Sequence, residues 1–323
     1  MHASLHWWLK IVKNFSTIEY SGGTLLYFSF SCSGAIDPSP DFFLTMTYIA
    51  VTHRDNEMPD KYNEQHPLWD EHTGRDPIIV TAIHSGHALR EEVREIMALD
   101  EASRLREEDP FTDAWMSISD NYILPERSRF EVDLNRARDE AVYISAEDAW
   151  GLNLWKTPPT KEMILHSLEE YDAFYEELGI LFDEMRARHG HFVIFDLHAY
   201  NFRRHGPDAE PQPEEENPEI NIGTGTLDRG YWGGLVDRFI HDLHGFDFLG
   251  RHLDVRENVK FVGRQFAQWT HDNYPKSACL LAIEFKKFYM DEWSGMGDPI
   301  QVQAIRQVLA STLPGIKESL AKL

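Results

Sequence analysis

Residues 77–95 read PIIVTAIHSGHALREEVRE and combine an apolar run, a turn with two histidines and a polar segment. The run at 78–83 is almost continuously apolar, which is typical of a strand buried on both faces of a parallel sheet. His84 and His87 follow it, and the Glu-, Arg- and Leu-rich sequence after them predicts a helix. In open α/β sheets, ligands bind beyond the carboxyl ends of strands. We therefore expect a functional site at this turn.

The rest of the chain alternates strand and helix patterns. Further strands are expected at residues 24–31, 43–51, 129–134, 191–197, 260–262 and 280–285, and helices at 88–107, 161–189, 231–243, 264–273 and 299–323. This alternation predicts an α/β fold, with a mostly parallel mixed sheet flanked by helices. We expect one domain over residues 21–323, preceded by a poorly ordered extension at 1–20.

Residues 203–226 are rich in Pro, Glu and Gly and predict a polar surface loop. Long loops in compact domains are often functional, so a lid over the site is the alternative interpretation.

Composition narrows the partners and the compartment. The chain has 31 Lys plus Arg against 54 Asp plus Glu, for a formal net charge of −23. Such a surface repels phosphate backbones and anionic lipids, so we expect neither nucleic acid nor a membrane as a partner. No run of about 18 apolar residues indicates a membrane span. The two cysteines, Cys32 and Cys279, are too few for a disulfide scaffold and favour a reducing, cytoplasmic location. The oligomeric state stays open.

Polar residues at or near the ends of predicted strands form the candidate site: His84, His87, Asn135, Arg136, His198 and Glu284. Imidazole nitrogen is a common zinc ligand, and a carboxylate beside a zinc-activated water can take its proton. The guanidinium fork of Arg136 matches a substrate carboxylate. Together these residues indicate metal-assisted hydrolysis of an acidic amide.

Each of these residues also has a purely structural interpretation. The chain has 16 histidines, and most histidines in proteins are surface or core residues without a metal. Glu284 lies in an apolar run, where a carboxylate needs either a function or an ion pair. Asn135 and Arg136 can serve as a helix cap and a salt bridge.

Several segments resemble known enzymes. Residues 132–136, VDLNR, resemble the segment of zinc carboxypeptidases and aspartoacylases whose Asn and Arg hold the substrate carboxylate. Residues 195–200, FDLHAY, are similar to their segment with a zinc-binding histidine, and Glu284 falls where they carry the catalytic glutamate. A closer resemblance, over residues 78–293, is to the N-formylglutamate amidohydrolase family. It rests on IHSG at 83–86, REEDPFTD at 106–113, DLNR at 133–136, DLH at 196–198 and AIEFKKFYMDE at 282–292.

This resemblance implies the phosphorylase/hydrolase-like fold of zinc exopeptidases. It also implies a zinc-dependent hydrolase that cleaves the carbon–nitrogen bond of a small anionic N-formyl or N-acyl amino acid. The implied roles are one zinc or other divalent ion on His84, His87 and His198, proton transfer by Glu284, α-carboxylate binding by Asn135 and Arg136, and carbonyl or second-carboxylate binding by Arg129 or Arg127.

Two departures from the related patterns leave alternatives open. Carboxypeptidases have Glu three residues after the first histidine, whereas position 87 is His, so the third ligand is His87, Glu91 or Glu92. Residues 262–264, VGR, stand where relatives often have paired glycines, which leaves the acyl group open. The alternative functions are a carboxypeptidase-like or γ-glutamyl peptide hydrolase and, in another class, a metal-free binding or regulatory protein.

Overall fold

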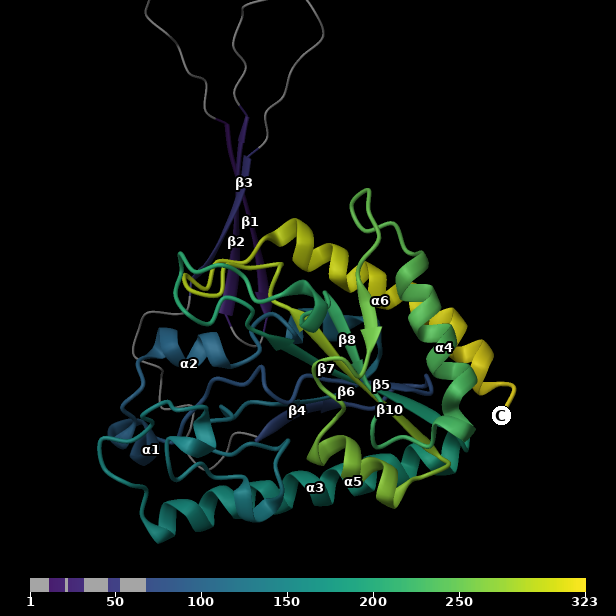
Figure 1. Ribbon diagram of the computed structural model, residues 1–323, viewed down its shortest axis with the longest axis horizontal. Helices are drawn as coiled ribbons and strands as arrows, with labels where there is room; N and C mark the ends of the chain where they lie inside the picture. The colour runs from purple at the N-terminus through teal and green to yellow at the C-terminus, as the bar shows by residue number, and fades with distance from the viewer. Residues whose placement is uncertain (1–11, 21–22, 32–45, 53–67) are drawn as a thin grey trace, which may run out of the picture.

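The chain forms two sheets in the computed structural model, which describes the backbone of residues 12–20, 23–31 and 46–52 and all of residues 68–323 (Figure 1). The smaller sheet is antiparallel and consists of β1 (Val12–Tyr20), β2 (Gly23–Ser31) and β3 (Met46–Thr52). β1 therefore occupies part of the predicted N-terminal extension and pairs with β2, with Tyr20 opposite Gly23. Residues 1–11 of that extension and Cys32 lie outside the described residues.

The larger sheet has seven strands in the order β4-β6-β5-β7-β10-β8-β9. Their bounds are β4 (Trp69–His72), β5 (Ile78–Thr81), β6 (Asn121–Pro125), β7 (Phe192–Tyr200), β8 (Ile220–Gly223), β9 (Val255–Glu257) and β10 (Ala278–Lys286). The four central strands β6, β5, β7 and β10 run parallel, while β4 and β8 are antiparallel to their neighbours in the centre. The predicted α/β fold with a mostly parallel mixed sheet is confirmed.

Helices cover both faces of this sheet. They are α1 (Glu91–Ile96), α2 (Glu101–Glu107), α3 (Lys161–His189), α4 (Arg229–Gly245), α5 (Gln265–Asn273) and α6 (Pro299–Leu320). Short 3-10 helices lie at Asp113–Ile118, Arg138–Glu140, Glu147–Ala149 and Glu214–Glu216. In Figure 1, α3 and α5 lie on one side of the sheet, and α4 and α6 on the other.

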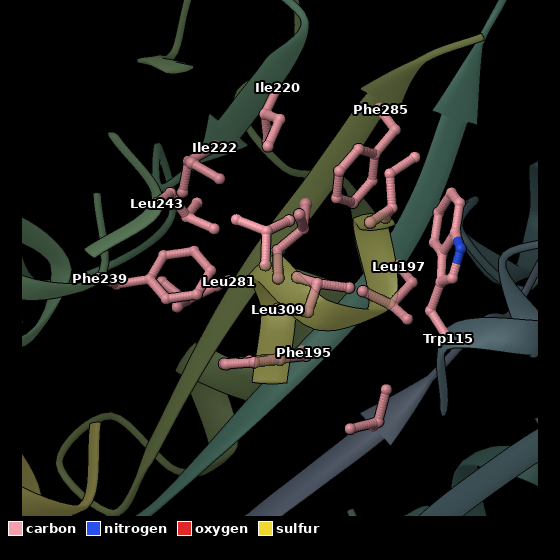
Figure 2. Close-up of a cluster of buried hydrophobic side chains, with 14 of the residues drawn as sticks. Trp115, Phe195, Leu197, Ile220, Ile222, Phe239, Leu243, Leu281, Phe285 and Leu309 are labelled. Atoms are coloured by element: carbon pink, nitrogen blue, oxygen red, sulfur yellow. The ribbon is translucent and has the colours of Figure 1, made fainter. Parts of the chain in front are cut away.

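The side chains of β7 and β10 alternate between these two helical layers. Toward α4 and α6 both strands stay apolar along their length, and Figure 2 shows Phe195, Leu197 and Leu281 packed with α4 and α6 side chains. Toward α3 and α5 the strands begin apolar, with Phe192 and Ile194 in the second core. Asp196, His198 and Tyr200 then follow at every second position of β7, so that face becomes polar toward the carboxyl end of the strand.

The long helix α3 confirms its prediction at both ends. Thr160 caps it by accepting a 3.2 Å hydrogen bond from Met163 N, and Gly190 ends it at a φ of 74°.

The predicted helix at residues 88–107 is wrong as a single element. It is divided into α1 and α2, because Asp100 caps a new helix by accepting a 2.7 Å hydrogen bond from Ser103 N. A good N-cap residue inside an apparent helical pattern starts a helix of its own.

Two predicted strands are also wrong. Residues 129–134 form turns instead, with both the alternating apolar side chains and the carboxylates of Glu131 and Asp133 buried. Residues 260–262 pair with none of the described strands, because the N–H groups of residues 259–261 bond to the side chain of Asn221. The predicted loop at 203–226 contains β8, and β4 and β6 were not predicted.

Candidate active site

Three buried side chains converge at the carboxyl ends of the central strands. His84 follows β5, His198 lies on β7, and Asp109 begins the segment after α2. Nδ1 of His198 lies 3.0 Å from Oδ2 of Asp109, and Nδ1 of His84 lies 3.5 Å from the same oxygen. One ligand atom from each residue lies within 4.8 Å of the others. The strand ends therefore gather two imidazoles and a carboxylate, as we predicted for His84 and His198 but not for Asp109.

Both imidazoles are oriented by an outer carboxylate. Nε2 of His84 lies 2.7 Å from Oδ1 of Asp133, and Nε2 of His198 lies 2.9 Å from Oδ2 of Asp196. Because a carboxylate accepts, each Nε2 donates its proton outward, and each Nδ1 faces Asp109 as a potential metal ligand. Three lone pairs in a buried space repel one another unless a cation lies among them. Without a metal that cation is a proton: although burial opposes it, Asp196 and Glu284 raise the pKa of His198 well above its ordinary value.

The residues fit a divalent metal ion. Catalytic zinc sites keep three protein ligands, commonly two histidines and a carboxylate, and tetrahedral ligands at about 2.0–2.1 Å lie about 3.3 Å apart. The separations of 3.0 and 3.5 Å between Asp109 Oδ2 and the two Nδ1 atoms bracket that value. Histidine ligands of metals usually donate their other N–H to a carboxylate, as His84 and His198 do here. His84, Asp109 and His198 can therefore hold a metal.

His87 is placed outside this group. Its Nδ1 bonds to Glu108 Oε2, and its Nε2 accepts a 2.9 Å hydrogen bond from Arg104. Glu108 also accepts from Ser128, so its buried carboxylate joins the histidine turn to the segment after β6. His87 thus bonds to the side chain of the residue before Asp109, and its predicted role as a metal ligand finds no support in this arrangement.

The other two candidates for the third ligand face elsewhere. Glu91 accepts from Arg94 within α1, at 2.7 Å. Oε1 of Glu92 lies 3.5 Å from Nε of Arg90. Neither belongs to the group around His84.

Asp133 is the centre of the VDLNR segment. Its carboxylate accepts from His84, from Arg129 Nη2 at 2.9 Å, from the Asn135 backbone N–H at 2.9 Å and from the Tyr143 hydroxyl. Although burial opposes ionisation, Arg129 and His84 hold the pKa of Asp133 well below its usual range. The segment turns rather than extending as a strand because the Asp133 side chain accepts from the N–H of Asn135, two residues later.

Arg129 and Arg136 flank Asp133. The Asn135 side chain accepts from Phe266 N at 3.1 Å, and Arg136 donates to the Asp148 carbonyl at 2.9 Å. Within residues 68–323, the buried Nε groups of Arg129 and Arg136 have no hydrogen-bond partner. Two guanidinium groups near His84 therefore retain donor capacity for an anion.

Arg127 is engaged differently from these two arginines. It makes a bidentate pair with Glu170 of α3, with both distances 2.9 Å. This geometry ties Arg127 to the helical layer.

Glu284 lies on β10 opposite His198 in the parallel register and opposite Asn221 of β8. It is half-buried, and its side chain shares the polar face with Asp196 and His198. Burial raises the pKa of Glu284 to about 7, with His198 opposing that rise and Asp109 adding to it. A carboxyl group with a raised pKa, beside side chains that could hold a metal, suits proton transfer.

The sequence analysis did not identify three aspartates as site residues, namely Asp109, Asp133 and Asp196. Asp196 had a detectable signal, since residues two apart on a strand face the same side and it precedes His198 by two. Asp133 and Asp109 lie within segments singled out by the resemblance, but their contacts to histidines cross large sequence separations.

Comparisons with known proteins agree with this fold. A model of the N-formylglutamate amidohydrolase family matches residues 76–290. A curated relative, the N-formylglutamate deformylase of Pseudomonas putida, is 28% identical over 168 residues, which cover 47% of this chain and 61% of the relative. The chain thus matches about three-fifths of the length of that relative.

Two solved structures resemble the fold. The crystal structure of an N-formylglutamate amidohydrolase from Ralstonia eutropha JMP134 aligns with a TM-score of 0.62 at 16% identity, covering 79% of this chain and 99% of that one. A gene product from Agrobacterium tumefaciens aligns with a TM-score of 0.57 at 16% identity, over 79% and 97% of the two chains. At this identity the likeness concerns the fold.

The fold and the buried histidine–carboxylate group are those of an α/β protein with a metal-competent site at its strand ends. This chain belongs to the N-formylglutamate amidohydrolase family, whose model spans the site from β5 to the end of β10. Among the described helices, none is long and apolar enough to cross a bilayer.

Proposed function

We propose that this protein is a metal-dependent amidohydrolase that cleaves the carbon–nitrogen bond of an N-formyl or N-acyl acidic amino acid. The observation that carries the proposal is the group of His84, Asp109 and His198, with an outer carboxylate on each histidine, beside Glu284. Family membership and the name of the Pseudomonas relative support an amide of the N-formylglutamate kind. Zinc suits the nitrogen and oxygen donors, and it would be held by these three residues in place of the His87 set.

When bound, zinc supplies a Lewis acid that makes water more acidic and polarises a carbonyl. Glu284 takes a proton from the attacking water while the new carbon–oxygen bond forms. It then delivers that proton to the amide nitrogen as the carbon–nitrogen bond breaks, which releases a carboxylic acid and a free amine. A partly buried carboxyl group on the same face as His198 suits a role in which it must accept and return a proton.

The arginines beside Asp133 complete the proposed site. Arg129 and Arg136 retain buried donors, and a substrate carboxylate would satisfy them. Asn135 would support them indirectly, because its side chain already holds the start of α5. Arg127, paired with Glu170, would act on the orientation of its neighbours rather than on the substrate.

The metal-free binding protein was suggested by the unusual histidine at position 87. His87 lies outside the group of His84, Asp109 and His198, so a change at that position removes none of these three candidate ligands. That alternative therefore loses the feature that favoured it.

Metal content tests the proposal most directly. Elemental analysis of the purified protein should find about one zinc per chain, lost in both Asp109→Ala and His198→Ala and retained in His87→Ala. The zinc-loaded protein should release formate or acetate from the N-formyl or N-acetyl forms of glutamate or aspartate. A native protein that takes up no divalent metal after incubation would contradict the mechanism. If His87→Ala loses the metal while Asp109→Ala retains it, the ligand set His84, His87 and His198 would be supported instead.

A further inference from the structure

The peptide group between Glu108 and Asp109 is hydrogen-bonded at both of its polar atoms. Its N–H, which belongs to Asp109, donates to the His84 carbonyl at 3.0 Å. Its carbonyl, which belongs to Glu108, accepts from Nζ of Lys287 at 2.7 Å. The orientation of this peptide plane helps to set the direction in which the Asp109 side chain leaves the backbone. The two bonds therefore hold the carboxylate of Asp109 toward the site.

Lys287 reaches this peptide group from the end of β10. It is the residue after the strand, and its backbone N–H donates to the Tyr200 carbonyl at the end of β7, at 3.0 Å. Its Nζ also donates to the Arg106 carbonyl at 2.6 Å. Lys287 is only 1% exposed, and a buried ammonium group needs such hydrogen bonds to offset its lost hydration. The side chain thus links the ends of two central strands to the segment that carries Asp109.

Two further side chains hold the chain as it leaves α2. The helix ends at Glu107, and carbonyls in the last turn of a helix lack partners within it. The Arg106 carbonyl accepts from Nδ2 of Asn201 at 2.9 Å in addition to Lys287. The Pro110 carbonyl accepts from the hydroxyl of the fully buried Tyr289 at 3.0 Å. The backbone is therefore held on both sides of the candidate ligand.

The ammonium group of Lys287 also brings a charge to this segment. Burial lowers the pKa of Lys287 to about 8. The charges that oppose this fall belong to Asp109, Glu107 and Glu292, while that of Arg204 adds to it. Because acidic residues surround the segment, a positive charge among its carbonyls reduces their mutual repulsion. A neutral donor at this position would supply the hydrogen bonds without that effect.

We propose that Lys287 is a positioning residue, whose ammonium group holds the backbone around Asp109 so that this carboxylate meets the two candidate histidine ligands. Tyr289 assists it through the Pro110 carbonyl. This inference rests on the proposed function, because it takes Asp109 as a metal ligand. Lys287 acts through Asp109 and is not itself a ligand. Metal sites depend on the groups that orient their ligands, and losing such a group typically lowers metal affinity about 10–100-fold.

Metal binding by Lys287→Met tests the proposal, because Met lacks the donor and the charge. Zinc affinity, measured by competition with a chelator, should fall about 10–100-fold. Cobalt binds to similar donors and absorbs visible light, so its spectrum in the variant should differ from that in the native protein. Lys286→Met is the matched control, because the neighbouring Lys286 donates to the Asn217 carbonyl, at 3.1 Å, and not to the segment of Asp109. The control should change neither measurement.

Hydrogen exchange in the metal-free protein measures the positioning without a metal. The Asp109 N–H is protected by its bond to the His84 carbonyl, so its exchange reports whether the peptide group is held. In Lys287→Met it should exchange at least about 10-fold faster. The Leu280 N–H, which donates to His271 within the core, should change much less. A purely structural role would accelerate both amides together, through a general loss of stability.

Two milder variants keep the test available if Lys287→Met does not fold. Lys287→Gln retains N–H donors on a shorter, uncharged side chain, and its zinc affinity should fall by at least about threefold. Tyr289→Phe removes only the bond to the Pro110 carbonyl and should give a smaller fall. Native zinc affinity together with native exchange of the Asp109 N–H in any folded Lys287 variant would overturn the proposal.

The same measurements separate failure of this inference from failure of the proposed function. If the protein binds zinc but hydrolyses no N-acyl amino acid, the function fails, and weaker zinc binding by Lys287→Met still supports the positioning role. If hydrolysis occurs and Lys287→Met keeps native zinc affinity and native Asp109 exchange, the positioning role fails and the function stands. Full zinc affinity in Asp109→Ala would also overturn the inference, because Lys287 would then have no ligand to position.

Discussion

The two faces of β7 and β10 differ although the same backbone supports both. Toward α4 and α6, alternate residues are apolar to the ends of the strands, from Phe195 to Ala199 and from Leu281 to Phe285. Toward α3 and α5, the apolar residues give way to Asp196, His198 and Glu284. Each large apolar side chain on the first face contributes roughly 1.5–3 kcal/mol by leaving water. The second face buries less apolar surface there, because its charged groups need polar partners. One face of the sheet therefore mainly stabilises the fold, and the other carries the candidate site.

Glu284→Gln should have the largest effect on the polar face of β7 and β10. Because Gln cannot accept the proton of water, we expect kcat to fall by about 10²–10⁴-fold. Zinc content should stay unchanged, since Glu284 is outside the proposed ligand group. The exposed Glu169 of α3 offers a control, and Glu169→Gln should retain full activity. Normal turnover in Glu284→Gln would remove this residue from the mechanism.

Phe195→Ala tests the apolar face. Phe195 is fully buried, and its loss should lower the free energy of unfolding by about 3–5 kcal/mol in a denaturant titration. The variant should still bind zinc wherever it is folded, because Phe195 points to the layer opposite the site. Ile180→Ala, at a position 51% exposed on α3, should change stability by less than about 0.5 kcal/mol. Equal effects of both substitutions would contradict the assignment of the core.

His271 is a buried histidine outside the candidate site, and its environment contrasts with that of His198. Nε2 of His271 accepts from Leu280 N at 3.1 Å, and its Nδ1 donates to Thr226 at 2.7 Å, so the ring is neutral in the fold. Burial lowers the pKa of His271 to about 4, from an ordinary 6.5. Between these values the unfolded chain binds the extra proton, so protonation favours unfolding. The contribution of His271 to the free energy of unfolding is complete above pH about 6.5. As the pH falls toward 4, up to about 3 kcal/mol of that stability is lost.

Chemical denaturation across that pH range measures the effect against His271→Gln, which lacks the titrating ring. The free energy of unfolding of the variant should fall less steeply between pH 6.5 and 4. Parallel curves for the two proteins would show that the ring is not neutral in the folded state.

Asp196→Asn should give the smallest of these effects. The amide can still accept from Nε2 of His198 but removes the negative charge that strengthens its partner as a ligand. We expect zinc affinity to fall about 10-fold, measured by competition with a chelator. Asp139→Asn, an exposed substitution, is the control. An unchanged affinity would mean that Asp196 only fills space beside the histidine.

Local signals in the sequence were sufficient to predict the central strands and the longest helix. The apolar runs at 78–83, 191–197 and 280–285 correspond to β5, β7 and β10, and α3 begins and ends at the predicted residues. These elements depend on short-range features, namely caps, periodicity and side-chain branching, which are visible in a single stretch of sequence. The strands at 129–134 and 260–262 failed because Asp133 and Asn221 redirect the backbone through their side chains.

The sequence by itself determined that His84, His198 and Glu284 stand at or near the ends of central strands and that the chain is an α/β protein. Only the tertiary structure decided that Asp109, rather than His87, meets the two histidines, and that Asp133 and Asp196 orient them. Asp109 and His198 are 89 positions apart, and no periodicity or local propensity acts over such a separation. The parallel order of β5 and β7 brings His84 and His198 to one edge of the sheet, and the Asp109 N–H, which donates to the His84 carbonyl at 3.0 Å, places its carboxylate beside them.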